Sequence, residues 1–250
     1  MRKEEHIPFI HNYCDRWCEK CAFTAQCRVY VKEMRLTDEQ KDMDNEAFWT
    51  NMQHNLLTAL DGLKKIALEQ GISLEEGSPD NEETEIEEVV LTPEQVALEN
   101  ESRRYITVTD QWFKAKMSLF EEKQKLLISH YEMGMDIDRR VVYRLNDALE
   151  AIKWYQYFIS AKVHRSLHGL DWVDIEGIDP VQNDSNGSAK IALISIDNSI
   201  NAWETIRNAF PEETDGILDV MLLLNKLRRG LLDIFPQAEN FKRPGFDDIY

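Results

Sequence analysis

Apolar side chains recur at helical spacing along most of the chain, and this pattern constrains the fold more than any other feature. In the clearest stretch the intervals are four, three, four, three, four and four residues, at Val141, Leu145, Ala148, Ile152, Tyr155, Ile159 and Val163. One face of an α-helix repeats at such intervals, because the helix turns once in about 3.6 residues. Trp154, Tyr157 and Phe158 widen this apolar surface, so we expect a central helix whose aromatic residues lie in a core.

Capping residues and glycines indicate where the other helices begin and end. Thr37 with Gln40, and Thr92 with Gln95, each match a capping box. The predicted helices cover 38–70, 93–133, about 138–168, 188–210 and 212–235. The stripes expected to be buried in the first two are Leu56, Leu60, Leu63 and Ala67, then Tyr105, Val108, Trp112, Ala115, Leu119 and Leu126. No strand alternation or hairpin signal appears, so we predict an all-α protein, an antiparallel bundle of four to five long helices with an N-terminal cysteine-rich metal-binding segment.

The negative charge is concentrated in one window. The net charge is −17, and twelve acidic residues but no Lys or Arg lie between Ile66 and Ser102. Within it, 72–91 is predicted to be a disordered acidic linker, because it has too few apolar groups to offset the cost of ordering. The expected organisation is a cysteine-rich segment (1–36) packed on the bundle, a helical bundle (37–235) interrupted by that linker, and an extended tail (236–250).

The same charge balance and the N-terminal sequence exclude several classes of partner and location. Nucleic acid and anionic membranes both attract basic surfaces, so neither is an expected partner. The first ten residues, MRKEEHIPFI, lack the apolar core of a signal peptide. We therefore expect a cytoplasmic protein. In a reducing compartment clustered cysteines favour a metal site over disulfides.

All four cysteines of the chain lie in one stretch of fourteen residues, CDRWCEKCAFTAQC, as Cys14, Cys18, Cys21 and Cys27. Cys14 and Cys18 can share one face of a helical turn, and two residues between cysteines is a spacing typical of metal knuckles. Cys27 would complete a shell of four thiolates, the number taken by zinc and by iron–sulfur clusters. The prediction is a [4Fe–4S] cluster or Zn²⁺ in a structural or electron-carrying role. The alternatives are reduced thiols or disulfides, and a site in which His11 replaces one cysteine.

The pattern C-x2-C-x-F-x3-C at residues 18–27 resembles the ligand segments of some iron–sulfur nucleases and of the auxiliary-cluster domains of radical-SAM enzymes. This resemblance covers about ten positions and implies a type of cluster, not an activity. Cys14, Cys18 and Cys21 also match the C-x3-C-x2-C signature of radical-SAM enzymes. That family has a βα barrel and leaves one iron open, whereas this chain is helical and Cys27 can fill the fourth place. We therefore do not assign radical-SAM chemistry.

Two weaker constellations lie on predicted helices. His164 and His168 are four residues apart, a spacing that can bind a metal if further ligands are present. An exposed or capping pair at a helix C-terminus, where a positive charge suits the helix dipole, is the favoured interpretation. Asp197, Asn201 and Glu204 share one helix face, but no histidine has an acidic residue three positions before it, as a ferritin-like di-iron site needs. No catalytic constellation is identified.

A second hypothesis is a helical protein–protein interaction module. In this interpretation the bundle presents a surface to a protein partner, and the metal site is only a structural staple. The acidic linker or the tail from Phe241 to Tyr250 would make the contact.

Overall fold

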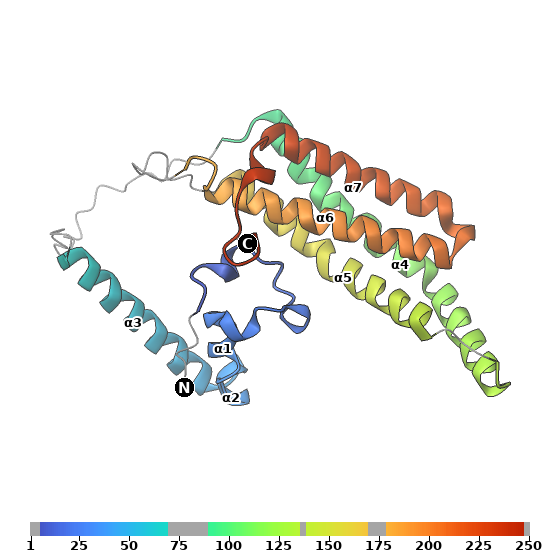
Figure 1. The fold of residues 1–250 in the computed structure, drawn as a ribbon, viewed down its shortest axis with the longest axis horizontal. Coiled ribbons are helices and arrows are strands. Elements are labelled where there is room, and N and C mark those ends of the chain that lie inside the picture. Colours follow the sequence, from blue (N-terminus) through green and yellow to red (C-terminus); the bar gives the residue numbers. More distant parts are fainter. Residues whose placement is uncertain (1–5, 70–89, 136–138, 170–178, 248–250) are drawn as a thin grey trace. The chain divides into compact units, whose positions relative to one another are not determined.

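The computed structural model describes residues 6–69, 90–135, 139–169 and 179–247, and every regular element in these ranges is a helix (Figure 1). The predicted all-α class is therefore confirmed for the described chain. None of its helices is both long enough and apolar enough to cross a lipid bilayer. Two compact units make up the chain. The described part of unit 1 is 6–7 with 18–69, and that of unit 2 is 8–17, 90–135, 139–169 and 179–247.

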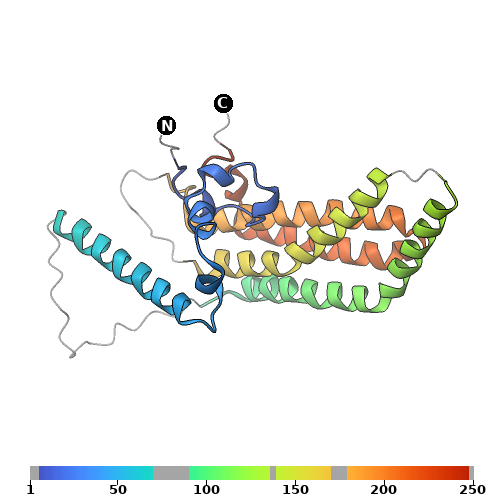
Figure 2. The same ribbon diagram turned by 90° about the horizontal axis from the view of Figure 1, so that it is seen from below.

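Four long helices form most of unit 2: α4 (Pro93–Glu132), α5 (Arg139–His168), α6 (Asp184–Ala209) and α7 (Thr214–Ile234). The main packing pairs are α5 on α4 and α6, and α7 on α6 and α4 (Figure 2). Helix α6 also contacts α4, because the Trp203 indole N–H donates to the Tyr105 hydroxyl. Their apolar faces meet in one continuous core. Its largest fully buried side chains include Tyr105, Ile152, Ile159, Trp203 and Leu224.

Polar contacts show that α4 and α5 run antiparallel. The hydroxyl groups of Ser102 and Ser160 lie 3.1 Å apart, and the Gln156 side-chain amide donates to Asp110 Oδ1 at 3.3 Å. Residue numbers thus rise along α4 while those of the partners fall along α5. This register brings the start of α4 beside the end of α5, which matters for the site described below.

The most buried helix is α6, whereas the sequence predicted that α5 would be central. Fourteen of the 26 residues of α6 are buried, against nine in 140–168 of α5. Trp154 and Tyr157, which widened the apolar surface of α5, are exposed at the surface. Small buried residues allow neighbouring backbones to approach α6 closely, namely Gly187, Ser188, Ala189, Ala192, Ser195 and Ser199. Such residues contribute little to an apolar pattern, so the pattern of the sequence does not indicate how deeply α6 is buried.

The predicted ends of the helices are partly confirmed. Both capping boxes are present, at Thr37 and at Thr92. Helix α4 ends two residues before Gly134, whose φ of +72° favours glycine. The helix predicted to begin at 188 begins earlier, at Asp184, because Asn183 caps α6 by accepting the backbone N–H of Asn186 at 2.7 Å. Most of the predicted linker 72–91 lies outside the described residues.

Unit 1 contains α1 (Arg28–Glu33), α2 (Asp38–Lys41) and α3 (Glu46–Glu69). The single helix predicted over 38–70 is therefore two helices. Between them the Asp42 side chain accepts the N–H of Asp44 at 3.0 Å, and Asn45 accepts the N–H of Ala47 at 3.0 Å. Such short polar side chains stabilise turns by bonding to nearby backbone groups.

The described part of unit 1 has almost no buried core. Ala67 is its one buried residue. The prediction that the apolar stripe of α3 is buried is wrong for three of its four residues, because Leu56, Leu60 and Leu63 are exposed. An isolated helix of this kind is marginal in water, so packing alone gives unit 1 little stability.

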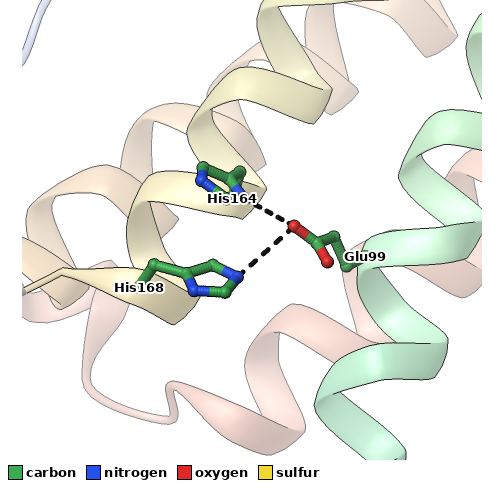
Figure 3. A group of neighbouring side chains, drawn as sticks. All are labelled: Glu99, His164 and His168. Carbon is green, nitrogen blue, oxygen red and sulfur yellow. Dashed lines mark hydrogen bonds and ion pairs between the residues drawn. The ribbon is translucent and has the colours of Figure 1, made fainter. Parts of the chain in front are cut away.

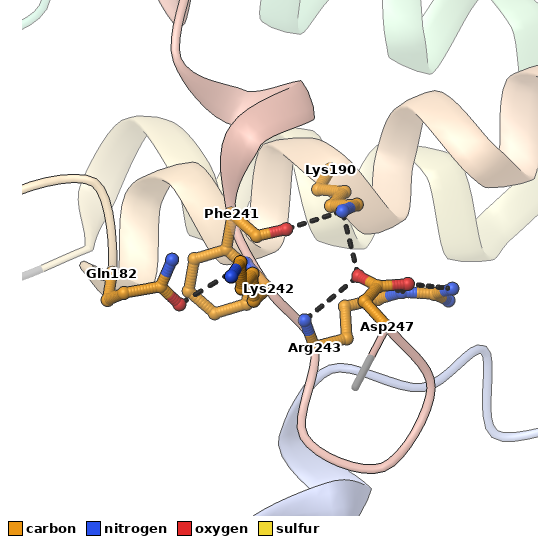
Figure 4. A network of polar contacts seen from close by, with 6 residues as sticks. All are labelled: Gln182, Lys190, Phe241, Lys242, Arg243 and Asp247. Carbon is orange, nitrogen blue, oxygen red and sulfur yellow. Dashed lines mark hydrogen bonds and ion pairs between the residues drawn. The ribbon is translucent and has the colours of Figure 1, made fainter. Parts of the chain in front are cut away.

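The C-terminal segment is folded onto α6, where the sequence led us to expect an extended tail (Figure 4). It contains a short 3-10 turn, and both Ala238 and Phe241 are buried. Lys190 of α6 donates to the Phe241 carbonyl oxygen and pairs with Asp247 at 2.7 Å. Arg243 also binds Asp247, at 2.8 Å. These contacts hold the segment in place through residue 247.

The Asp247 carboxylate makes the tail contact sensitive to acid. Burial raises the pKa of Asp247, but hydrogen bonds from Arg243 and Lys190 outweigh it and hold that pKa well below the ordinary value. A lowered pKa in the folded state contributes stability above the unfolded pKa of about 3.9, and this stability is lost as the pH falls toward the folded value.

We therefore expect Asp247→Asn to lower the free energy of unfolding by about 1–3 kcal/mol at pH 7. The difference from the wild type should shrink as the pH falls below about 4. Urea unfolding at pH 7 and pH 3 measures both effects, with Asp219→Asn on the exposed face of α7 as the control. An equal difference at the two pH values would contradict the assignment.

Candidate functional site

Residues 8–17, called here the N-terminal strap, lie on α5 and α6 within unit 2. The Tyr13 hydroxyl donates to Asp184 Oδ1 at 3.1 Å, and the Tyr155 hydroxyl donates to Asp15 Oδ2 at 2.8 Å. Burial, and then the neighbouring Asp184 carboxylate, raise the pKa of Tyr13 to about 12. The pKa of Tyr155 is raised for the same reasons, by burial and then by Asp15. Both tyrosines therefore remain neutral donors, and they fix the strap that carries Cys14.

A buried lysine lies beneath the strap close to Cys14. The Lys162 ammonium group donates to the Asn12 carbonyl oxygen at 3.3 Å. Burial lowers the pKa of Lys162 to about 8, and two nearby arginines add to this, while the Cys14 thiolate and Asp184 act in the opposite direction. Cys14 itself donates to the His11 carbonyl oxygen at 3.6 Å. A cation so close favours the thiolate form of a cysteine, the form that binds metals.

The other three cysteines belong to unit 1 and lie on or directly beside short helical turns. The Cys21 N–H donates to the Cys18 carbonyl oxygen at 3.2 Å, which closes the turn between them. The Phe23 N–H donates to Cys21 Sγ at 3.4 Å. Hydrogen bonds from backbone N–H groups stabilise a sulfur that carries negative charge, and they tune thiolate-bound metals. Cys27 is the N-cap residue of α1.

The four predicted ligands are thus divided, with Cys14 in unit 2 and Cys18, Cys21 and Cys27 in unit 1. All four are half-buried thiols. In the described ranges, the one set of three or more candidate ligand atoms within 4.8 Å of one another lies elsewhere. The four-cysteine site therefore stays a prediction. His11, the alternative ligand, lies on the strap three residues before Cys14, and burial and then Arg16 lower its pKa.

The set that the structure does bring together is Glu99 of α4 with His164 and His168 of α5 (Figure 3). Glu99 Oε1 lies 2.6 Å from His164 Nδ1 and 3.5 Å from His168 Nε2. The two imidazole rings face each other with centroids 4.2 Å apart. Helical spacing along α5 pairs the two histidines, but it does not show which residue of α4 meets the end of α5, so Glu99 was not among the predicted site residues.

The Glu99 carboxylate lies in a positively charged setting. Its side chain is only 11% exposed, and Arg103 Nη2 approaches the same Oε1 atom at 3.2 Å. The hydrogen bond from His164 lowers the pKa of Glu99, burial opposes this, and Arg103 adds to the lowering. The group therefore holds a carboxylate anion between two imidazoles, an arrangement that can bind a proton or a metal ion.

The two carboxylates that were predicted to share one face of α6 each form an ion pair with an arginine. Asp197 pairs with Arg228 at 2.9 Å, and Glu204 pairs with Arg207 at 2.5 Å. These contacts give both groups a structural role on the surface of unit 2.

Comparison of the chain with protein-family models, with curated proteins and with solved structures found no match. The function of the chain is therefore inferred from its candidate site residues. They form two groups, the cysteine segment 14–27 and the Glu99–His164–His168 cluster, which differ in the chemistry of their ligands.

Proposed function

We propose that the cysteine segment binds a metal centre and that this centre holds unit 1 together. The observation that carries the proposal is that unit 1 contains three of the four cysteines and has Ala67 as the one buried residue of its described part. Small units without a sufficient core need a disulfide, a metal or a partner to fold. Four thiols in fourteen residues supply the ligands for a metal.

The proposed ligands are Cys14, Cys18, Cys21 and Cys27, and the proposed centre is a [4Fe–4S] cluster or Zn²⁺. Four residues of chain keep Cys14 and Cys18 within about 14 Å even when fully extended. The Lys162 cation beside Cys14 favours the thiolate form of that cysteine. The role that follows is structural or electron-carrying.

Anaerobic purification followed by metal analysis and an absorption spectrum tests this proposal. A broad band near about 400 nm with iron and sulfide would identify an iron–sulfur cluster. A colourless protein with one zinc ion lost on thiol modification would identify a structural zinc site. Protein that contains neither metal, and takes up neither after reduction, would overturn the proposal.

We expect Cys18→Ser and Cys21→Ser each to release the metal. Serine is similar in size but presents a poorly acidic hydroxyl, so the shell of ligands opens. Unit 1 should then be cut rapidly by trypsin while the helices of unit 2 persist in circular dichroism, because they have their own core. Ala25→Ser, at an exposed position in the same segment, introduces the same residue and should retain the metal. Retention of the metal in both cysteine variants would rule out these ligands.

The exposed face of α3 favours a second function, the binding of a helical protein partner. Trp49, Leu56, Leu60 and Leu63 are all exposed on this helix, and such a stripe is typical of a helix that packs on another surface. The tail contact predicted from the sequence is less suitable, because Phe241 is buried against unit 2. Sedimentation and pull-down of the wild type and of Leu60→Glu test this function, and identical behaviour of the two proteins would count against it.

A further inference from the structure

The Glu99–His164–His168 cluster joins two helices of unit 2 and contains none of the cysteines. His164 and His168 occupy adjacent turns of α5, and the antiparallel register places Glu99 of α4 opposite them (Figure 3). We propose that these three residues form a second metal site, which binds a divalent first-row transition metal through one carboxylate oxygen and two imidazole nitrogens.

The distances between the ligand atoms suit such an ion after a small adjustment. Around a tetrahedral zinc ion with bonds of about 2.0–2.1 Å, neighbouring ligand atoms lie about 3.3 Å apart. The 3.5 Å between His168 Nε2 and Glu99 Oε1 is already close to this value. The 2.6 Å between His164 Nδ1 and Glu99 Oε1 is a hydrogen bond, which must lengthen when a metal replaces the proton. The His164 side chain is 56% exposed, so it has room to move.

A second, independent observation comes from His168. Its Nε2 atom is covered by protein and has no hydrogen-bond partner in the described part of the chain. The ion-pair distance of 3.5 Å to Glu99 is too long for a good hydrogen bond. Buried polar atoms are nearly always satisfied, so an atom of this kind indicates a missing partner. A metal ion between His168 and Glu99 would supply that partner.

The ligand types separate this site from the cysteine segment. Two imidazoles and one carboxylate suit Zn²⁺, Co²⁺, Ni²⁺ or Fe²⁺, whereas four thiolates suit Zn²⁺ or an iron–sulfur cluster. Three protein ligands would leave a fourth position for water, because His164 lies at the surface. Arg103 competes for Glu99 Oε1, but its side chain is 61% exposed and can turn away when a cation binds. The competing explanation is that Glu99 and His164 form only an ion pair that holds α4 to α5.

Metal titration distinguishes the site from a simple ion pair. The variant in which all four cysteines are replaced (Cys14→Ser, Cys18→Ser, Cys21→Ser and Cys27→Ser), called here the four-cysteine variant, is used for this test. It is titrated with Zn²⁺ by calorimetry and with Co²⁺ by absorption spectroscopy. We expect one equivalent of metal to bind. Glu99→Gln, His164→Gln and His168→Gln in this background should each weaken binding roughly tenfold or more, because each removes a ligand. His54→Gln, an exposed histidine of α3, should leave the affinity unchanged.

A spectroscopic measurement identifies the ligands directly. Co²⁺ should shift the ring signals of His164 and His168 in proton–nitrogen NMR spectra and leave those of His54 in place. Wild-type protein loaded with its cysteine-bound metal provides the same test if the four-cysteine variant does not fold, since a second equivalent should then bind. Binding that is unchanged by all three glutamine substitutions, or no binding in either protein, would overturn the proposal. The cysteine centre is tested separately, because Cys18→Ser should release the cysteine-bound metal and His164→Gln should retain it.

Discussion

Replacing Trp203 by alanine is expected to lower the free energy of unfolding of unit 2 by about 3–5 kcal/mol. Trp203 is fully buried on α6. The centroid of its ring lies 5.0 Å from that of Trp112 and 5.7 Å from that of Phe113. Its indole N–H donates to the Tyr105 hydroxyl at 3.1 Å. The substitution therefore leaves a large cavity at the centre of the core and also removes a hydrogen bond from a buried tyrosine.

Urea unfolding followed by circular dichroism measures this loss. Leu222→Ala is the control, because Leu222 is 62% exposed on α7 and should change the stability by no more than about 0.5 kcal/mol. Trp203→Phe should fall between the two, since it refills part of the cavity. A loss below about 1.5 kcal/mol for Trp203→Ala would mean that the core collapses around the site and is less rigidly packed than described.

Gly187→Ala is expected to cost about 1–3 kcal/mol, although alanine is the better helix former. A Cβ atom at Gly187 would lie 2.4 Å from Tyr13 Cε1 and 2.8 Å from Phe241 Cζ. These two rings also contact each other, with centroids 4.6 Å apart. Because aromatic rings are rigid, both must move as a whole, and the strap and the C-terminal segment should loosen together.

Limited trypsin digestion reports this loosening at Arg16 in the strap and at Arg243 in the C-terminal segment. Gly216→Ala is a matched control in the first turn of α7, where the nearest atom to the new Cβ would lie 3.7 Å away. It should leave the digestion pattern unchanged. Tyr13→Ala should reduce the additional cost of Gly187→Ala, because it removes one of the two clashing rings. Equal protease resistance of Gly187→Ala and the wild type would contradict the close packing.

The sequence predicted well those features of the helices that depend on residues close together in the chain. The capping boxes at Thr37 and Thr92 depend on residues within three positions, and both are present. The break between α2 and α3 was missed, because the predicted apolar stripe begins only at Leu56 and says nothing about the turn that Asp42 and Asn45 stabilise. The central place of α6 was also missed, because serine and glycine add little apolar character even where they allow close packing.

The candidate sites show the same limit. The spacing of His164 and His168 is visible along one helix, but Glu99 joins them only through the packing of α4 on α5. The cysteines are close in sequence, yet Cys14 belongs to one unit and the next three cysteines to the other. Spacing shows which residues the chain keeps near one another, whereas the division into units depends on contacts that are distant in sequence.

The chain leaves unit 2 after Trp17 and rejoins it near residue 90, so most of unit 1 is an insertion into the helical unit. The strap is thereby separated in sequence from the helices on which it lies, and its side chains hold it there, among them the fully buried Ile10. A nick within α3 would leave two fragments that still share one folded core. The strap would then act as a docked peptide, and the two fragments would remain associated without a covalent link.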